Sequence, residues 1–407
     1  MDYIQKLPEP GALLRKHSHD RQVPEVNGHL HSPNSFCAFN SIEQMFQMAL
    51  EEGVKVLGIN DFYTADGYDE FALEGLRNRI FPLFNIEFMG LMQDMQKQDI
   101  RVNDPNNPGR TYFSGKALKH PLSVSSENSK FLKDLQHSSQ VQVKEMINKA
   151  DAHLHAINAR FNITYEQIRG KYAHKLVRER HIARAIREAI MESYLTVDEI
   201  YSFFMLLFDG RKLFVSLNNP SAVENEIRSV LLKAGGRAFV PEDKDAFPEL
   251  QRIIDFILDA GGIPCYPVLL DDRNGNMTGF EGNWERMDEV LQSFGVSCLE
   301  LIPLRNSLEK LEEFVDYFRR KKYIISFGTE HNSPGLFPIT VKVNKDQDLP
   351  PELKKVSYEG CCMLAAHQYL VARGQEGFID GQGRMDIENQ DHYRDLGNAV
   401  IKEFTSS

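Results

Sequence analysis

Cysteine is scarce in this sequence, and its distribution predicts neither a metal site nor a disulfide framework. The 407 residues include five cysteines, an odd number, and none has the spacing of zinc ligands. Adjacent cysteines, such as Cys361 and Cys362, rarely pair with each other. We therefore expect reduced thiols, which are typical of a cytoplasmic protein.

Long apolar runs are also missing. No stretch of the sequence approaches the roughly 20 apolar residues that cross a bilayer. The segment 1–20 lacks the apolar centre that a signal peptide needs. We therefore expect a cytoplasmic protein that does not contact a membrane.

The chain has no surplus of positive charge. Lys and Arg number 47 against 58 Asp and Glu, which gives a formal net charge of −11. Because nucleic-acid backbones bind clustered cationic side chains, this balance argues against an extended nucleic-acid surface. It is compatible with a local basic pocket for one small phosphorylated molecule.

Apolar residues are present in sufficient number for a sizeable core, at 42% of the chain. They form short runs that alternate with helical patterns, which favours parallel β/α units. Segments at Leu231 (LLKAGGRAFVPED) and Ile257 (ILDAGGIPCYPVL) each predict a helix, a glycine cap and a strand. The turn-rich segment around Arg110 predicts a loop. The predicted strands are Val26–His31, Val54–Asn60, Leu83–Met89, Ile263–Leu270, Val296–Ile302 and Tyr323–Phe327.

The stretch from about 128 to 210 breaks this alternation. Apolar residues from Val143 to Phe161 recur with a spacing near 3.6 residues, and a second helical pattern covers Ile182–Ile190. We interpret the stretch as a helical insertion or cap. The chain after it is expected to continue the β/α units that precede the insertion and to end in a helical extension. The predicted divisions are 1–23, 24–127, 128–210, 211–345 and 346–407.

Three His-x-His triplets occur, and local geometry separates them. On a strand, residues i and i+2 face the same side, so two imidazoles can share one metal, whereas on a helix they point in different directions. The triplet at 153–155 lies in a helical pattern and the triplet at 17–19 in a polar stretch, so we expect both at the surface. His29 and His31 end a short predicted strand, where a barrel places its catalytic groups.

Charged residues at other predicted strand ends strengthen this candidate. Asp61 closes one strand, Glu87 interrupts an apolar run, and Glu330 and His331 follow another strand. A carboxylate in a buried strand is costly unless it is paired or bound to a metal. Two histidines and two carboxylates would form a mixed nitrogen and oxygen site for zinc, manganese or iron. The alternative is a polar network that joins the strands at the rim of the fold.

These residues lie in motifs that resemble those of PHP (polymerase and histidinol phosphatase) proteins. The motifs GHLHSPNSF, LGINDFYTADGYDEF, NIEF, AGGIPCYP and SFGTEH occur in the family's order across residues 24–340. The segment VRERHIARAI is similar to the cap region of PHP nucleotide phosphoesterases. The resemblance implies an α/β fold, namely a distorted (β/α)7 PHP-type barrel with a helical cap insertion. It also implies divalent metals at the carboxyl ends of the strands.

The resemblance assigns metal ligands residue by residue. His29, His31, Glu87 and Glu330 would hold one divalent ion per chain, which could be zinc, manganese or iron. In the terminal motif, either Glu330 replaces the family's aspartate or His331 takes the family's histidine role. Aromatic residues stand at other ligand positions of the family and would remove its further metal sites: Phe36, Phe62 and Tyr266.

The remaining roles concern the water and the substrate. Asp61 or His331 would orient or deprotonate the attacking water. Arg180 would bind the phosphate and His181 would assist. The alternative is that these residues belong, with Arg178, to a solvated basic face of the helix.

Three further residues are considered as site residues: Glu300, Tyr112 and His367. Glu300 lies in a buried strand, where Arg305 is the expected partner. Tyr112 could stand at a position where relatives carry a ligand. His367, in a helical pattern outside the motifs, is expected to be a core or rim histidine.

The sequence therefore predicts a cytoplasmic, metal-dependent hydrolase of a small phosphoester, a nucleotide or a sugar phosphate, with a reduced site for one metal. A rival interpretation is a non-catalytic PHP-fold protein that binds a ligand or partner, since aromatic residues fill ligand positions. A third is a metal-dependent amide or lactone hydrolase, because one scaffold serves several reactions.

Overall fold

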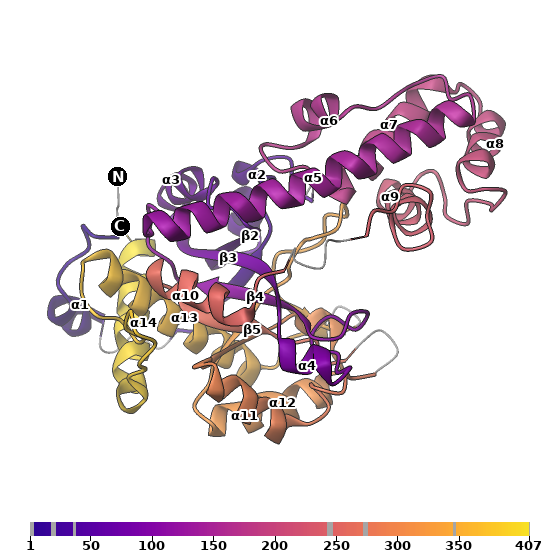
Figure 1. Ribbon diagram of the computed structural model, residues 1–407. Coiled ribbons are helices and arrows are strands. Elements are labelled where there is room, and N and C mark those ends of the chain that lie inside the picture. Colours follow the sequence, from indigo (N-terminus) through magenta and orange to yellow (C-terminus); the bar gives the residue numbers. More distant parts are fainter. Residues whose placement is uncertain are drawn as a thin grey trace.

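A seven-stranded sheet forms the centre of the molecule (Figure 1). The computed structural model describes residues 4–17, 22–35, 38–241, 247–271, 276–344 and 347–406. The strands of the central sheet are β1 Glu25–Leu30, β2 Val54–Phe62, β3 Phe81–Leu91, β4 Arg110–Lys116, β5 Ile263–Pro267, β6 Cys298–Leu301 and β7 Ile324–Phe327.

The strands lie side by side in the order of the sequence, from β1 to β7. Neighbouring strands are parallel, except that β4 runs antiparallel to both β3 and β5. Beyond β7, the backbone N–H groups of Thr329 and Glu330 donate to the His29 carbonyl oxygen, and Leu30 forms a bridge with Glu330. The sheet is therefore a nearly closed α/β barrel that brings the end of β1 next to the chain after β7.

Strand β4 corrects the prediction of a loop around Arg110. The glycine, proline and asparagine signals belong to residues 104–109, which precede the strand, while Thr111, Tyr112 and Phe113 favour a strand. An antiparallel strand needs no helical crossover to join it to its neighbour. The β/α alternation on which the prediction depended is therefore absent at this point.

Helices cover the outside of the barrel, so β2 and β3 are buried along nearly their whole length. Helix α13 packs against β7 and α14, and α14 packs against α1 near the chain ends (Figure 1). No helix within the described ranges is both long and apolar enough to span a membrane. The bounds of these helices are α1 Pro10–His17, α2 Ile42–Glu51, α3 Tyr68–Asn78, α4 Gln93–Lys97, α10 Leu250–Asp259, α11 Trp284–Ser293, α12 Leu308–Arg320, α13 Pro351–Ala372 and α14 Gln390–Ser406.

Residues 126–232 form a helical unit with a hydrophobic core of its own. Its long helix α5 runs from the side of the barrel toward α7 and α8 (Figure 1). The predicted helix reached Phe161, but α5 ends at Ala156 because Asn158 adopts a left-handed backbone with φ of 55°. The helices of the unit are α5 Ser126–Ala156, α6 Tyr165–Tyr172, α7 Glu179–Ser193, α8 Val197–Leu207, α9 Pro220–Ile227 and the π-helical turn Arg228–Leu232.

The two glycine-capped joints of the sequence differ in the structure. The joint at Ile257 is confirmed, since α10 passes through Gly261 and Gly262 into β5. The joint at Leu231 is wrong in part, because the described residues 238–241 form no strand. The remaining short elements are the strands β8 Lys342–Val343 and β9 Gln347–Asp348, which form a separate sheet, and the 3-10 turns Pro303–Arg305 and Ile387–Asn389.

Candidate metal centre

The candidate site lies at the carboxyl end of β1 and beside the end of β2. His29 is in β1, His31 directly follows this strand, and Glu87 in β3 pairs with Phe62, the last residue of β2. Gly328 permits the close approach of the chain after β7, because a Cβ there would lie 2.4 Å from the His29 Cβ. His29, His31 and Glu87 are all buried, and we call them the His–His–Glu group.

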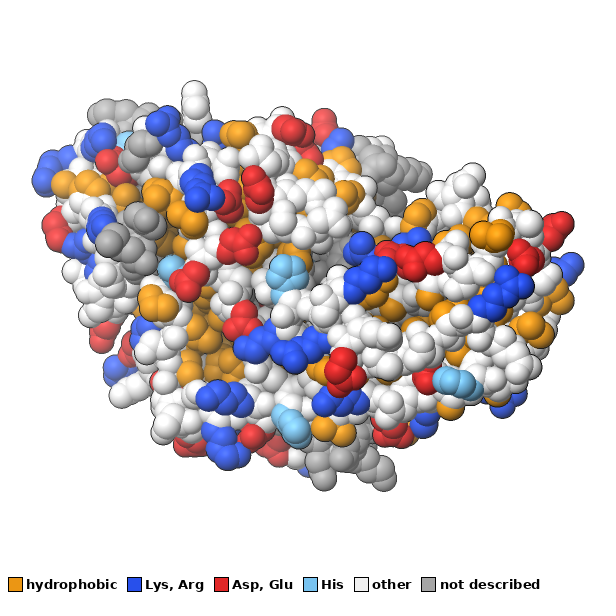
Figure 2. Space-filling model, turned by 90° about the horizontal axis from the view of Figure 1, so that it is seen from above, with side chains coloured by type: hydrophobic (Ala, Val, Ile, Leu, Met, Phe, Trp, Pro, Cys, Tyr) orange, Lys and Arg blue, Asp and Glu red, His pale blue; other side chains and the backbone are white. Residues whose placement is uncertain are grey.

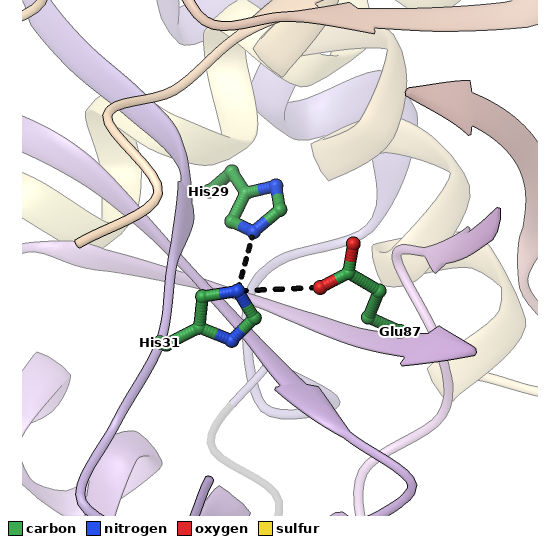
Figure 3. A group of neighbouring side chains, drawn as sticks. All are labelled: His29, His31 and Glu87. Atoms are coloured by element: carbon green, nitrogen blue, oxygen red, sulfur yellow. Dashed lines mark hydrogen bonds and ion pairs between the residues drawn. The ribbon is translucent and has the colours of Figure 1, made fainter. Parts of the chain in front are cut away.

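The atoms of this group converge on one point (Figure 3). His31 Nε2 lies 3.3 Å from His29 Nε2 and 3.2 Å from Glu87 Oε2. One ligand atom from each of the three residues lies within 4.8 Å of the others. In a tetrahedral zinc site with metal–nitrogen distances of about 2.0–2.1 Å, ligand atoms are about 3.3 Å apart. The three side chains therefore have the spacing at which they can hold a divalent cation.

The protonation of the group also suits a cation. Burial lowers the pKa of His29 and lowers that of His31 far below its ordinary value, so both imidazoles are neutral near pH 7. Burial raises the pKa of Glu87 to about 7, and its Oε2 accepts no hydrogen bond from the described residues. A neutral imidazole offers a lone pair, and a buried oxygen without a hydrogen bond is costly. A bound cation would use the lone pairs and satisfy the oxygen.

A buried ion pair lies behind His29. The Glu300 carboxylate in β6 lies 2.7 and 2.8 Å from His29 Nδ1, and it pairs with Lys116 from β4. Burial acts to raise the pKa of Glu300, but the Lys116 ammonium and the hydrogen bonds from His29 and Lys116 outweigh it and hold this pKa at about 2. The ionised carboxylate therefore accepts the Nδ1 proton of His29 and leaves the lone pair on Nε2.

Asp61 lies under the turn that follows His31. Its carboxylate accepts hydrogen bonds from the Ser32 backbone at 2.7 Å and from the Ser35 hydroxyl at 2.6 Å. The Ser35 oxygen is also 3.2 Å from His31 Nδ1. Burial raises the pKa of Asp61 to about 6. Because the Ser35 hydroxyl donates to Asp61, its oxygen accepts from His31 Nδ1, which again leaves the lone pair on Nε2.

The structure does not bring Glu330 into the His–His–Glu group. Glu330 lines the adjoining cavity, and its carboxylate pairs with Arg305. The prediction that a structural partner such as Arg305 pairs with Glu300 is confirmed in kind, but the partner is Lys116. Glu330 is therefore paired with Arg305 and is not a member of the His–His–Glu group.

His331 is likewise engaged elsewhere. Its Nδ1 lies 2.8 Å from the Thr329 hydroxyl and its Nε2 lies 2.9 Å from the Phe337 carbonyl oxygen. Burial lowers its pKa to about 4, so the ring is neutral. Both ring nitrogens already have partners, and a role in activating water would require one of these hydrogen bonds to break.

A cavity of about 1240 Å³ lies between the barrel and the helical unit. His29, Glu87 and Glu300 line its barrel side, and residues of α5 and α7 line the opposite side. Figure 2 shows Lys and Arg side chains near the middle of one face, where the barrel and the helical unit meet. Glutamates line the same cavity, so a basic residue attracts anions there only where no carboxylate neutralises its charge. The basic residues that line the cavity are Arg110, Arg178, Arg180, Arg228, Lys233 and Arg305.

The sequence suggested that Arg180 and His181 would both face the substrate, but the structure places the two side chains differently. Arg180 lines the cavity and donates to Asn225 Oδ1 at 3.0 Å. His181 is buried, and its Nδ1 accepts the Arg178 backbone N–H at 2.9 Å, so it caps the first turn of α7. Arg178 itself, which the sequence suggested only for a solvated face, lines the cavity.

Aromatic side chains occupy two positions for which the sequence resemblance implied metal ligands in relatives. The Phe62 ring stacks on His31, with ring centres 5.9 Å apart. The Tyr266 hydroxyl donates to Glu281 at 2.6 Å and accepts the Asn103 backbone N–H at 3.0 Å. These side chains therefore serve packing and hydrogen bonding around the site.

The other candidates lie apart from the His–His–Glu group. The triplet at 153–155 is on α5, and His17 at the end of α1 pairs with Glu403 of α14. His367 is buried in α13, and its Nε2 lies 2.9 Å from the Gly261 carbonyl oxygen. Tyr112 lines the cavity. Two residues considered from the sequence lie outside the described part of the chain: His19 and Phe36.

Comparisons with known proteins identify the fold. No family model and no curated protein sequence matches the chain. The chain is similar to a structure from Bifidobacterium adolescentis named as a metal-dependent phosphoesterase, with 15% identity, a TM-score of 0.53, and coverage of 83% of this chain and 96% of that one. It is also similar to an amidohydrolase from Chromobacterium violaceum with bound sulfate and no metal, with 16% identity, a TM-score of 0.52, and coverage of 80% and 92%. At these identities the likeness shows a shared fold.

Proposed function

We propose that this chain is a metal-dependent hydrolase of a small phosphoester, with a PHP-type site that keeps the ligands for only one divalent cation. The observation that carries the proposal is the convergence of His29, His31 and Glu87 within 4.8 Å of one another beside a cavity that arginines help to line. The PHP-like motifs and the fold shared with a protein named as a phosphoesterase support it. In this proposal the barrel is a PHP-type barrel and the helical unit is its cap.

The side chains of the proposed site have separate tasks. The His–His–Glu group holds the cation, which is zinc, manganese or iron given the nitrogen and oxygen donors. When bound, the cation supplies a Lewis acid that stabilises charge developing on the phosphoryl oxygens. Glu300 holds the proton on His29 Nδ1, and Asp61 does the same for His31 through Ser35. The helical unit covers the opposite side of the cavity and limits the access of bulk water.

A second candidate function is a non-catalytic protein that binds a phosphorylated ligand in the same cavity. The observation that favours it is Tyr266, whose hydroxyl is already bonded to Glu281 and Asn103. Burial raises the pKa of this phenol well above its ordinary value, so it is a poor metal ligand. Hydrolysis of phosphoesters often uses two metals, and this side of the site offers no help in holding a second one.

A hydrolysis screen decides between the two candidates. Protein loaded with zinc, manganese or iron would be tested on nucleotides, sugar phosphates, amides and lactones. We expect phosphoester hydrolysis that Glu87→Gln reduces at least about 100-fold, because removal of a ligand loses the cation. Glu74→Gln is the matched control, since Glu74 is a buried glutamate of α3 that pairs with Arg77. A metal-loaded protein that hydrolyses none of these compounds would favour the binding protein.

A further inference from the structure

The basic residues of the cavity differ in how far their charges are already neutralised. Acidic side chains pair with most of them, while Arg180 bonds to the neutral Asn225. In the described parts of the chain, no carboxylate lies within ion-pair distance of Arg178. The ion pairs of the other basic residues are Arg110 with Asp104, Arg228 and Lys233 with Glu179, and Arg305 with Glu330.

Arg178 is nevertheless held in one place. It directly precedes α7, and its guanidinium carbon lies 5.2 Å from the centre of the Phe62 ring and 5.3 Å from that of Tyr63. Its Nη2 donates to the Phe62 carbonyl oxygen over a long 3.4 Å, and its Nε is buried without a hydrogen-bond partner. Contacts with aromatic faces fix a guanidinium without neutralising its charge. Most of its five N–H donors remain available.

The position of Arg178 is next to the His–His–Glu group. Phe62, on which the guanidinium lies, pairs with Glu87 across β2 and β3. The same ring stacks on His31. Arg178 and Glu87 both line the cavity. The cation site and the guanidinium therefore share one aromatic side chain as a support.

We propose that Arg178 is the principal anion-binding residue of the cavity and that its guanidinium binds the non-bridging oxygens of a phosphoryl group set against the His–His–Glu group. This inference rests on the proposed function and gives Arg178 the phosphate role that the sequence suggested for Arg180. The planar fork of an arginine matches two oxygens of a phosphate, and partial desolvation strengthens the contact. His181 then acts on α7, whose start it caps.

Binding of inorganic phosphate to the full chain without added metal tests this directly. Titration calorimetry of Arg178→Gln should show phosphate affinity reduced by about 10- to 100-fold, the usual loss for a hydrogen bond to a charged group. Arg178→Lys keeps the charge but loses the fork, so an intermediate affinity is expected. Arg228→Gln is the matched control, because Arg228 lines the same cavity but pairs with Glu179, and its affinity should stay within about 3-fold of the unaltered protein.

Three results would overturn the inference. The unaltered protein could fail to bind phosphate, Arg228→Gln could lose as much affinity as Arg178→Gln, or Arg178→Gln could lower the melting temperature while phosphate affinity is unchanged. The last result would mean that Arg178 only fastens α7 to Phe62. A His29→Ala, His31→Ala variant separates the inference from the proposed function, because it should lose metal and hydrolysis yet still bind phosphate through Arg178. Phosphate binding without any hydrolysis would leave the inference standing and reject the enzyme.

Discussion

At the scale of single residues, a carboxylate stands behind each histidine of the candidate centre. Glu300 contacts His29 Nδ1 directly, and Asp61 reaches His31 Nδ1 through the Ser35 hydroxyl. Both arrangements place the proton on Nδ1 and the lone pair on Nε2. Two N–H groups directed at each other across the 3.3 Å between the Nε2 atoms would repel, whereas two lone pairs suit a shared cation.

We predict that Glu300→Gln weakens metal binding by about 10- to 100-fold, because the amide no longer fixes the His29 tautomer. Competition with a chelating dye measures the affinity. Glu281→Gln is the matched control, since Glu281 is an equally buried glutamate whose side chain contacts Tyr266 and Thr278. Equal metal affinities in Glu300→Gln and the unaltered protein would show that Glu300 does not position His29.

Lys116 permits a second prediction, about stability. Its ammonium is fully buried and pairs with Glu300. Lys116→Met should lower the free energy of unfolding by about 3–5 kcal/mol, because it leaves the carboxylate buried with less compensation. Urea unfolding measures this loss, and a Lys116→Met, Glu300→Met double variant should recover much of it. If the single variant were as stable as the unaltered protein, the pair would not hold the barrel interior together.

The residues of the site differ in how far the sequence could predict them. His29, His31 and Glu87 were identifiable because a strand places alternate residues on one side and because a buried carboxylate needs a partner. Lys116 was not identifiable, since its strand was predicted as a loop and its partner Glu300 is distant in sequence. Both Arg178 and Arg180 line the cavity, and the histidine cap that begins α7 has no sequence signature.

At the scale of secondary-structure elements, α13 lies close against the barrel. A Cβ at Gly360 would lie 1.9 Å from the Ile325 carbonyl oxygen of β7. The backbone of α13 therefore contacts the backbone of β7 at this point. A side chain at residue 360 would push the helix away from the strand. The contact places α13 behind β7, the last strand before the Thr329–His331 segment.

Gly360→Ala should therefore destabilise the protein by about 1–3 kcal/mol, as other overpacked cores do. Gly170→Ala is the control, because Gly170 lies in α6 with nothing within 4 Å of its added Cβ. Alanine is the better helix former, so this control should be neutral or more stable by up to about 1 kcal/mol. Thermal melting of the two variants gives the comparison, and equal melting temperatures would contradict the close packing.

Most barrel strands were predictable and β4 was not, for a physical reason. Parallel strands covered by helices are buried on both faces, so they appear as the apolar runs found at β2 and β3. Strand β4 follows a turn-rich segment and runs antiparallel to its neighbours. The end of α5 depended on a left-handed residue, Asn158, that apolar spacing does not reveal.

At the scale of the whole molecule, the barrel and the helical unit have separate hydrophobic cores, and the cavity lies between them. Local sequence patterns describe each core but not the orientation of one toward the other. The cavity and the residues that line it could therefore not be predicted from the sequence, which indicated only a local basic pocket.

The pH dependence of stability follows from buried neutral histidines. Burial lowers the pKa of His367 to about 4, against about 6.5 in an unfolded chain. Between these values the unfolded state binds more protons, so His367 makes stability fall as pH drops from about 6.5 toward 4. The loss attributable to His367 is about 3 kcal/mol at pH 4.

His367→Gln should therefore flatten the decline in unfolding free energy between pH 7 and pH 4. Glutamine can still donate to the Gly261 carbonyl oxygen but does not titrate. Denaturant unfolding across this pH range measures the slope, with His155→Gln as the control because His155 is exposed on α5. The account would be contradicted if both variants kept the slope of the unaltered protein.

The most direct test of the central claim is the metal content of the purified protein. Elemental analysis would compare the unaltered chain, a His29→Ala, His31→Ala variant and a His153→Ala, His155→Ala variant from the triplet on α5. We predict about one zinc, manganese or iron ion per chain, lost only when the His–His–Glu group is altered. A folded protein that holds no metal and gains none on incubation, or that keeps its metal without His29 and His31, would contradict the single-metal centre.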